Sequence, residues 1–340
     1  MLHRSKAPLR IGLAGGGTDV SPYSDLYGGA ILNATVSLFA HASIEPLEED
    51  TLIFRGLDRQ EEQIHECGGE LPIDGKLDLL KGVYNRIKKE FGIPGNGLRL
   101  STFVDAPAGS GLGTSSTLVV AIIGAFSEML RLPLGEYDVA HLAYDIERND
   151  LQMAGGRQDQ YAATFGGVNY MEFFEKDRVI VNPLRVKQQY LFELENNLLL
   201  YYTSTSRESA KIIEKQSRNV IEKKESSIEA MHQLKIQALL MKEALLKGKI
   251  NQIGEILDFG FRQKQQMAEG ISNPLIDEIY ENAKLAGATG GKISGAGGGG
   301  FMTFYCPGVS KYRVMEVLGQ FGGHCRPYQF TDHGLTTWTI

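Results

Sequence analysis

Residues 107–116 read Pro-Ala-Gly-Ser-Gly-Leu-Gly-Thr-Ser-Ser and lie between a predicted strand, residues 98–104, and a predicted helix, residues 115–131. Three closely spaced glycines allow the backbone N–H groups to wrap around an anion. The start of the helix adds the positive end of its dipole, and the hydroxyls that follow Gly113 can reach a phosphate or a magnesium ion. The stretch therefore predicts a phosphate-binding loop.

Two better-known phosphate loops do not fit this stretch. The Gly-Lys-Ser/Thr ending of a Walker loop is absent, and the glycine spacing is not that of a Rossmann dinucleotide fingerprint. The remaining alternative is an ordinary turn between a strand and a helix. Such a turn does not need three glycines and four hydroxyl side chains, so we favour the phosphate loop.

Two further glycine clusters flank this loop along the chain. Residues 7–19 read APLRIGLAGGGTD, and residues 292–300 read KISGAGGGG. In order, the three segments resemble the N-terminal, phosphate-binding and C-terminal motifs of the GHMP kinases, the family of galactokinase, homoserine kinase, mevalonate kinase and phosphomevalonate kinase. The family's phosphate motif is usually Pro-X-X-X-Gly-Leu-Gly-Ser-Ser-Ala, from which Thr114 and Ser116 depart mildly.

The resemblance implies which residues bind ATP. The phosphate loop would contribute Pro107, Ala108, Gly109, Ser110, Gly111, Leu112, Gly113, Thr114, Ser115 and Ser116. The C-terminal glycine motif would contribute Ser294, Gly295, Gly297 and Gly298.

The resemblance also implies an α+β fold with two domains. The N-terminal domain, residues 1–185, would resemble domain 2 of ribosomal protein S5, and the C-terminal domain, residues 186–340, would be ferredoxin-like. Hydrophobic periodicity independently predicts strands and helices in both halves. Predicted strands cover residues 7–14, 31–44, 98–104, 168–174, 178–181, 198–203, 300–305 and 335–340. Predicted helices cover residues 77–90, 115–131 and 136–150, two successive runs between residue 207 and about residue 246, a helix from residue 274 that Gly287 ends, and a last helix between the strands 300–305 and 335–340.

Two charged residues are candidates for catalysis. Asp159, in the segment GGRQDQYAATFGG, resembles the family's catalytic aspartate, which can accept or orient the proton of the acceptor hydroxyl. Arg10, on the polar face of the first strand, resembles the cation beside that aspartate. The alternatives are a capping or salt-bridge role for Asp159 and a solvated edge-strand position for Arg10.

A magnesium site is implied by the mevalonate kinase branch of the family. Ser115 and Glu147 match the hydroxyl and the carboxylate that hold Mg²⁺ there. Oxygen ligands suit this hard cation. The alternative for Glu147 is a surface ion pair with Arg148.

The N-terminal motif narrows the range of substrates that the resemblance implies. Gly16, Gly17, Thr18 and Asp19 replace the family's Gly-Glu-His and resemble the branch of bacterial heptose 7-phosphate kinases, and less closely the L-fucose kinases. A carboxylate and a hydroxyl beside small glycines suit vicinal sugar hydroxyls. For the phosphate of the sugar, we predict a site at residues 203–207 that includes Arg207. The alternative for this segment is an ordinary run of helix-capping residues.

The implied reaction is phosphorylation at C1 of D-glycero-D-manno-heptose 7-phosphate by ATP, on the route to a nucleotide-activated heptose. A kinase for a free sugar such as L-fucose and a non-catalytic sugar sensor remain alternatives. The sensor is disfavoured because Arg10, Ser115 and Asp159 are all present.

Composition limits the remaining partners. A formal net charge of −6 argues against a general nucleic-acid binder, and three cysteines without CxxC spacing suit a reducing compartment. The longest apolar run, residues 118–126, is far shorter than the ~20 residues that span a bilayer. We therefore predict a cytoplasmic protein, monomer or homodimer, that binds neither nucleic acid nor membrane.

Overall fold

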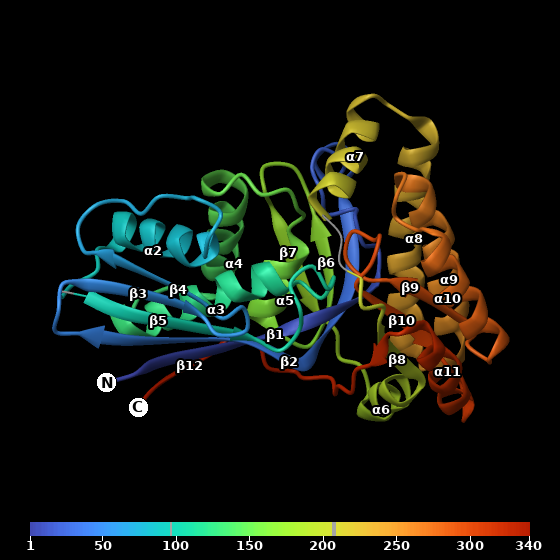
Figure 1. Cartoon of the computed structure of the whole chain (residues 1–340). Helices are drawn as coiled ribbons and strands as arrows, with labels where there is room; N and C mark the ends of the chain where they lie inside the picture. Colours follow the sequence, from blue (N-terminus) through green and yellow to red (C-terminus); the bar gives the residue numbers. More distant parts are fainter. Residues whose placement is uncertain (96, 206–208) are drawn as a thin grey trace.

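The computed structural model describes residues 1–95, 97–205 and 209–340, which form two sheets with helices packed against each (Figure 1). The first sheet contains β1 (His3–Ala14), β2 (Gly29–Leu47), β3 (Thr51–Gly56), β4 (Glu61–Glu66), β5 (Gly97–Val104), β6 (Val168–Phe173), β7 (Val179–Pro183) and β12 (Thr336–Thr339). Its order is β12-β1-β2-β5-β3-β4, with β6 and β7 continuing beside β2. Only β3 and β5 pair in parallel among the described strands.

The strand β1 lies inside this sheet, between β12 and β2. Its Leu9, Ile11 and Leu13 are fully buried on one face, as the alternation of the sequence predicts. The opposite face is buried as well, since Arg10 is only 3% exposed. The interior position of β1 therefore fixes Arg10 beneath the cavity described below.

Four helices lie on one face of the first sheet (Figure 1). They are α2 (Asp78–Phe91), α3 (Thr114–Leu130), α4 (Glu136–Asp145) and α5 (Gln158–Phe165), and a short α1 (Tyr23–Tyr27) follows β1. The helix α3 is buried on nearly all sides from Ser116 to Phe126, as its apolar sequence predicts. The predicted helix 136–150 is α-helical only to Asp145 and then widens into a π-helical turn, η1 (Ile146–Asp150).

The second sheet has the order β11-β8-β10-β9 and is antiparallel throughout. Its strands are β8 (Leu198–Tyr202), β9 (Gly290–Ile293), β10 (Phe301–Tyr305) and β11 (His324–Cys325). The accompanying helices are α6 (Gln188–Asn197), α7 (Ser209–Ile221), α8 (Glu225–Lys247), α9 (Ile253–Met267), α10 (Pro274–Leu285) and α11 (Ser310–Leu318), with 3₁₀ turns η2 (Ile250–Gln252) and η3 (Gly319–Phe321). The predicted start of α10 is confirmed, because the Asn273 side chain accepts a hydrogen bond from the N–H of Ile276 at 3.1 Å.

The two halves are joined by a continuous hydrophobic core and by the end of the chain. Met241 and Leu245 of α8 belong to the same buried cluster as Leu9 and Ile11 of β1. The last strand, β12, pairs with β1, so both termini lie at the same edge of the first sheet (Figure 1). The chain passes from the first sheet to the second between β7 and β8 and returns to the first sheet with β12. The domain boundary at residues 185/186 stays a prediction.

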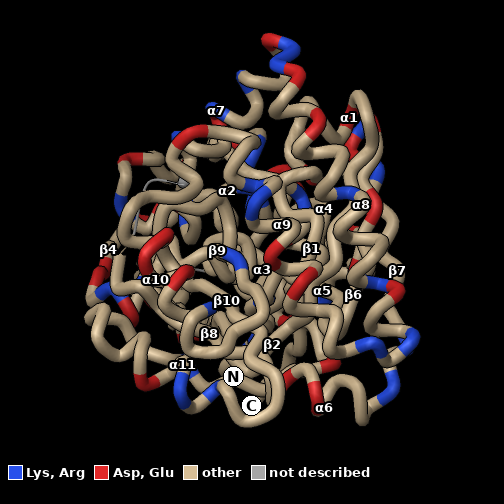
Figure 2. Tube along the Cα trace, turned by 90° about the vertical axis from the view of Figure 1, so that its right-hand side faces the viewer, with Lys and Arg blue, Asp and Glu red and all other residues tan. Residues whose placement is uncertain are grey.

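Charges are mixed over the second half of the molecule. Figure 2 shows Lys and Arg interspersed with Asp and Glu along its helices, with both signs on α7. The helices of the described residues are too short or too polar to span a bilayer.

Candidate active site

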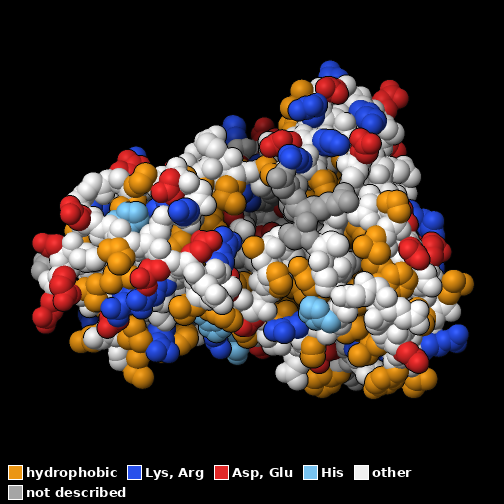
Figure 3. Space-filling model, in the orientation of Figure 1, with side chains coloured by type: hydrophobic (Ala, Val, Ile, Leu, Met, Phe, Trp, Pro, Cys, Tyr) orange, Lys and Arg blue, Asp and Glu red, His pale blue; other side chains and the backbone are white. Residues whose placement is uncertain are grey.

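A cavity of about 420 Å³ lies between the two halves of the molecule. Its walls come from β1, the turn after β1, the phosphate loop, η1, the 152–159 segment, α7, α9 and the turn at residues 295–296. In the space-filling view the surface is hollowed between the halves, below the projection formed by α7 (Figure 3). Segments that are far apart in the sequence thus converge on one space.

The phosphate loop has the conformation that its glycines predict. Gly109, Gly111 and Gly113 all have positive φ angles, of 71°, 84° and 80°, and Gly113 directly precedes α3. Six of the ten predicted residues line the cavity: Gly109, Gly111, Gly113, Thr114, Ser115 and Ser116. Pro107 and Ala108 are exposed, and Leu112 is buried beneath the loop.

The C-terminal glycine motif supports this loop from the second half. A Cβ on Gly295 would lie 2.7 Å from the Cα of Gly111, so the two turns touch through backbone alone. The Phe301 N–H donates to the Ser110 carbonyl at 2.8 Å. Gly297 and Gly298, by contrast, pack against Ile271, outside the cavity.

Two buried hydroxyls remain without a partner at this junction. The Oγ atoms of Ser110 and Ser294 form no hydrogen bond within the described part of the chain. A buried hydroxyl without a partner is costly, but neither serine lines the cavity, so the pair does not by itself mark a ligand position.

Arg10 and Asp159 form a direct ion pair at the floor of the cavity. Arg10 Nε donates to Asp159 Oδ1 at 2.7 Å, and Nη2 lies 2.5 Å from the same oxygen. Arg10 Nη1 donates to the Gly111 carbonyl at 2.6 Å. The Arg10 side chain is 4% exposed and that of Asp159 is 25% exposed, so a solvated edge-strand position for Arg10 is excluded.

Glu147 is buried on the π-helical turn beside α3. Its side chain is 1% exposed, and Gln160 Nε2 donates to its Oε2 at 2.5 Å and to Ser116 Oγ at 3.2 Å. Burial raises the pKa of Glu147. The alternative of a surface ion pair with Arg148 is therefore wrong, because Glu147 is buried. The nearest atoms of the two charged groups are nevertheless 3.9 Å apart, within ion-pair distance.

Ser115 and Glu147 line the cavity together. A carboxylate whose charge is disfavoured by burial would gain from a nearby cation, and the hydroxyl adds a second oxygen donor. The two residues therefore fit a magnesium ion that is completed by water and by phosphate oxygens.

Asp19 faces the cavity from the turn after β1. Its Oδ2 accepts hydrogen bonds from the backbone N–H groups of Arg157 at 2.9 Å and Gln158 at 3.1 Å. Its Oδ1 is buried and has no partner among the described residues. Burial raises the pKa of Asp19, and the nearby carboxylate of Asp159 adds to this effect. The unpaired oxygen is positioned to accept a hydrogen bond from a bound hydroxyl.

The neighbours of Asp19 in the predicted substrate motif have different positions. Gly17 lines the cavity, whereas Gly16 and Thr18 are not in its wall. The Thr18 hydroxyl lies 2.9 Å from the Gly15 carbonyl and 3.0 Å from the Ala30 carbonyl, and it accepts from the Ala30 N–H. This hydroxyl is thus engaged within the turn. Arg207 lies outside the described residues.

Replacing Gly156 by alanine should weaken sugar binding specifically. A Cβ at this position would lie 1.9 Å from Asp19 Oδ2 and would push the carboxylate off the two amides that orient it. We expect the KM for the sugar to rise at least about tenfold, the size of one lost hydrogen bond to a charged group, with little change for ATP. Gly319→Ala, where a Cβ meets nothing within 4 Å, is the control. Steady-state kinetics with an unchanged sugar KM for Gly156→Ala would contradict the role of Asp19.

Known proteins resemble this chain over nearly its whole length. The sequence pattern of the GHMP kinases N terminal domain matches residues 78–167, and that of the GHMP kinases C terminal matches residues 241–319. The D-glycero-alpha-D-manno-heptose 7-phosphate kinase of Campylobacter jejuni is 47% identical over 337 residues, which are 99% of either chain. The chain belongs to the GHMP kinase family.

Two solved structures extend the resemblance to the fold. A D-glycero-D-manno-heptose 1-phosphate kinase from Bacteroides thetaiotaomicron has a TM-score of 0.84 at 44% identity, with 99% of both chains covered. A putative sugar kinase from Campylobacter jejuni has a TM-score of 0.82 at 45% identity, with 100% of this chain and 98% of that one covered. The predicted α+β fold with its two domain types is confirmed. This GHMP kinase is a sugar kinase that transfers a phosphoryl group from ATP to an alcohol.

Sequence reasoning missed two polar residues of this GHMP kinase site. Gln160, which bridges Ser116 and Glu147, follows Asp159 directly and could have been found from that adjacency. Lys264 lies in α9 within a charged helical stretch, GFRQKQQM, that carries no motif. Its ammonium reaches the cavity because α9 packs beside β9 and β1. The residue spacing in the sequence does not predict this packing.

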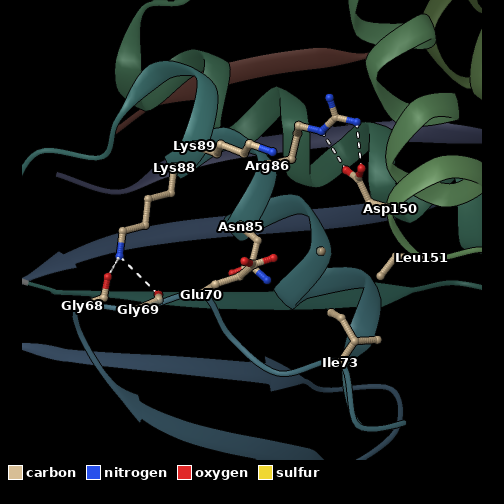
Figure 4. A pocket seen from close by; sticks show the side chains of 11 residues that line it. Gly68, Gly69, Glu70, Ile73, Asn85, Arg86, Lys88, Lys89, Asp150 and Leu151 are labelled. Atoms are coloured by element: carbon tan, nitrogen blue, oxygen red, sulfur yellow. Dashed lines mark hydrogen bonds and ion pairs between the residues drawn. The ribbon is translucent and has the colours of Figure 1, made fainter.

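A larger hollow of about 560 Å³ lies elsewhere, between α2 and residues 68–73 (Figure 4). Three of its charged side chains are engaged within the protein, since Arg86 binds Asp150 through two hydrogen bonds of 2.7 and 2.9 Å and Lys88 donates to backbone carbonyls. None of the predicted site residues lines it. We therefore place the active site in the smaller cavity between the halves.

Proposed function

We propose that this GHMP kinase phosphorylates the C1 hydroxyl of D-glycero-D-manno-heptose 7-phosphate and releases the 1,7-bisphosphate and ADP. The single observation that carries the proposal is the unpaired, buried Asp19 Oδ1 in the same cavity as the Arg10–Asp159 pair. A hydroxyl-rich acceptor is then held beside the group that can receive its proton. The name of the Campylobacter jejuni relative supports the choice of sugar.

In this proposal the described residues divide the work of phosphoryl transfer. Asp159 accepts the proton of the C1 hydroxyl. The C1 oxygen of the sugar forms the new bond to the γ-phosphorus of ATP while the bond between that phosphorus and ADP breaks. Arg10 orients Asp159 and stabilises charge on the transferring group. The backbone N–H groups of the phosphate loop and the N-terminus of α3 hold the nucleotide phosphates.

Ser115 and Glu147 would hold the magnesium ion. When bound, Mg²⁺ neutralises part of the charge of the phosphates and fixes their orientation. The protein's own contribution is the set of hydrogen bonds from Gln160 that keeps the Glu147 carboxylate facing this space. Gln160 thereby also links Glu147 to Ser116 at the start of α3.

Exchanging Glu147 for glutamine should raise the magnesium requirement. The change keeps the size of the side chain but removes the anionic ligand, and we expect the Mg²⁺ concentration for half-maximal rate to rise about 10- to 100-fold. A magnesium titration of the rate at saturating ATP measures this. Asp145→Asn, on the preceding helix and outside the cavity wall, should leave the titration unchanged. An identical titration for Glu147→Gln and the unmodified enzyme would contradict the metal assignment.

A side hollow of about 290 Å³ continues from the cavity and shares Ser115 and Met153 with it. Apolar groups of Leu77, Leu79, Leu118 and Leu151 contribute to its wall. A flat, mostly apolar group attached to the phosphates suits such a space, so we assign the adenine base to it.

The phosphate of the sugar remains assigned to residues 203–207. Thr203 lies near the glycine motif, since its Oγ1 donates to the Gly300 carbonyl at 2.9 Å and lies 2.8 Å from Thr205 Oγ1. This contact supports a position near the C-terminal glycine motif for Thr203 and Thr205. Arg207 supplies the cation in the proposal.

The reaction is tested by measuring ADP release with a set of acceptors and locating the new phosphate by ³¹P NMR. We expect D-glycero-D-manno-heptose 7-phosphate to give the highest kcat/KM and a product phosphorylated at C1 and C7. The position of the new phosphate on the sugar must be measured, because the Bacteroides thetaiotaomicron neighbour is named a heptose 1-phosphate kinase. Equal activity on the free heptose or on L-fucose would favour a free-sugar kinase, and no ADP release with any sugar would favour a sensor.

The proposal includes a reducing, cytoplasmic setting and no particular oligomeric state beyond a monomer or homodimer.

A further inference from the structure

A buried lysine from the second half of the molecule faces the cavity. Lys264 of α9 is 4% exposed, lines the cavity wall and donates a hydrogen bond from Nζ to the Gly295 carbonyl. Gly295 is the residue that touches Gly111 of the phosphate loop. Arg10 donates to the Gly111 carbonyl from the other side. The two cations therefore flank the junction between the two glycine-rich turns.

The Lys264 ammonium has no direct counterion in the described part of the chain. It forms no ion pair there, although the Asp19 and Asp159 carboxylates are near enough to favour its charge. A buried ammonium that makes a single hydrogen bond leaves two N–H donors unused, which is costly unless a ligand accepts them. An anion in the cavity would meet this need.

A second buried lysine, Lys292, also makes a single hydrogen bond among the described residues, so the unused donors of Lys264 indicate a ligand only together with its place in the cavity wall. Lys292 of β9 is 6% exposed and donates to the Gly12 carbonyl at 2.6 Å. It is not part of the cavity wall. Lys264 differs in facing the open space, and its position is therefore not explained by packing alone.

We propose that Lys264 binds an oxygen of a phosphoryl group in the cavity, a role that rests on the proposed kinase function. Two groups have this chemistry: the phosphoryl group in transfer and the phosphate carried by the sugar. The bond to Gly295, next to the phosphate loop, favours the transferring group. Lys264 is then a catalytic residue that the second half contributes opposite Arg10.

The electrostatic surroundings of Lys264 agree with this role. Burial, with a smaller effect from Arg10 of β1, lowers the pKa of Lys264 to about 8, and Asp19 of the following turn and Asp159 of α5 oppose this change. Lys292 of β9 also lies close. Because the folded-state pKa is below that of the unfolded chain, the charged lysine opposes folding below about pH 8. Removing the charge should therefore not destabilise the protein at neutral pH.

The test compares Lys264→Met with the unmodified enzyme in steady-state kinetics and thermal unfolding. If the transferring group is bound, kcat should fall about 10²- to 10³-fold, with the KM of each substrate changed less than about threefold and an unchanged or higher Tm. If the sugar phosphate is bound, the KM for the phosphorylated sugar alone should rise by a similar factor. Arg262→Met is the control, because Arg262 lies on the same helix, is 59% exposed and pairs with Asp258 outside the cavity.

A binding measurement separates this inference from the identity of the sugar. Titration calorimetry with ADP alone and with ADP plus aluminium fluoride requires no acceptor and no turnover. We expect the gain in affinity given by the fluoride complex to be lost in Lys264→Met and kept in Arg262→Met. Kinetics and titrations of Lys264→Met that match the unmodified enzyme would overturn the proposal. An inactive unmodified enzyme that still shows the titration difference would instead count against the proposed reaction alone.

Discussion

Replacing Asp159 by asparagine should lower kcat by about 10³-fold, near the middle of the range for a positioned general base. Asparagine keeps the size of the side chain and can still accept a hydrogen bond from Arg10, but it cannot take up the proton of the acceptor hydroxyl. Because the change leaves the buried Arg10 without its carboxylate, we also expect a lower Tm, and thermal unfolding should be measured to confirm that the variant is folded in the assay. ATP binding should change little, which single-turnover kinetics and a nucleotide titration would measure.

The molecule offers a matched control for this change. Asp150 is also paired with an arginine, Arg86, through two hydrogen bonds, but the pair lies in the other hollow (Figure 4). Asp150→Asn should therefore leave kcat unchanged. A kcat for Asp159→Asn within about tenfold of the unmodified enzyme would mean that Asp159 only orients the hydroxyl or the neighbouring cation.

Replacing Arg10 by methionine should lower kcat by about 10²- to 10³-fold, the usual effect of removing one donor that stabilises charge in the transition state. Arg10 makes three contacts at once, two to the Asp159 carboxylate and one to the Gly111 carbonyl. Its loss should therefore misalign the carboxylate and loosen the phosphate loop. We expect both kcat and the KM for ATP to change.

The double variant of Arg10 and Asp159 provides the sharper measurement. Residues that act as a unit give strongly non-additive effects, so the double variant should be about as slow as the slower single variant. Multiplication of the two single effects would show that the ion pair has no joint role. Arg86→Met tests whether removing any arginine of a similar pair produces the loss.

The sequence identifies the parts of this site that are carried by local motifs. The phosphate loop, the first strand with Arg10 and the segment with Asp159 are each recognisable, because glycine spacing and strand alternation are local properties. Their convergence in one cavity was expected from the family resemblance. The 420 Å³ cavity lined by all three segments agrees with it. The roles of the individual residues stay predictions.

Other features of the fold and of the site depend on long-range contacts, which local sequence patterns do not predict. The strand β4 was missed because it is short, charged and exposed, which obscures any alternation. The strand β3, whose six residues do alternate between buried and half-buried positions, was missed as well. The π-helical turn at Glu147 lies beside α2, where Arg86 binds Asp150 of this turn, and this long-range contact could not be predicted from the sequence. The Thr18 hydroxyl was expected to face the sugar, yet its bonds to Gly15 and Ala30 could be known only from the path of the turn.

The return of β12 to the first sheet limits how this enzyme can open. The chain crosses between the halves near residue 185 and again before β12, where the Thr337 and Thr339 hydroxyls donate to Glu128 of α3. Two bodies tethered at two points cannot swing freely about a single linker. Entry and exit of substrates must therefore use small rotations about an axis through both tethers, or rearrangement of the α7 end of the cleft. Release of β12 from β1 would remove one of the two connections between the halves and allow larger rotations between them.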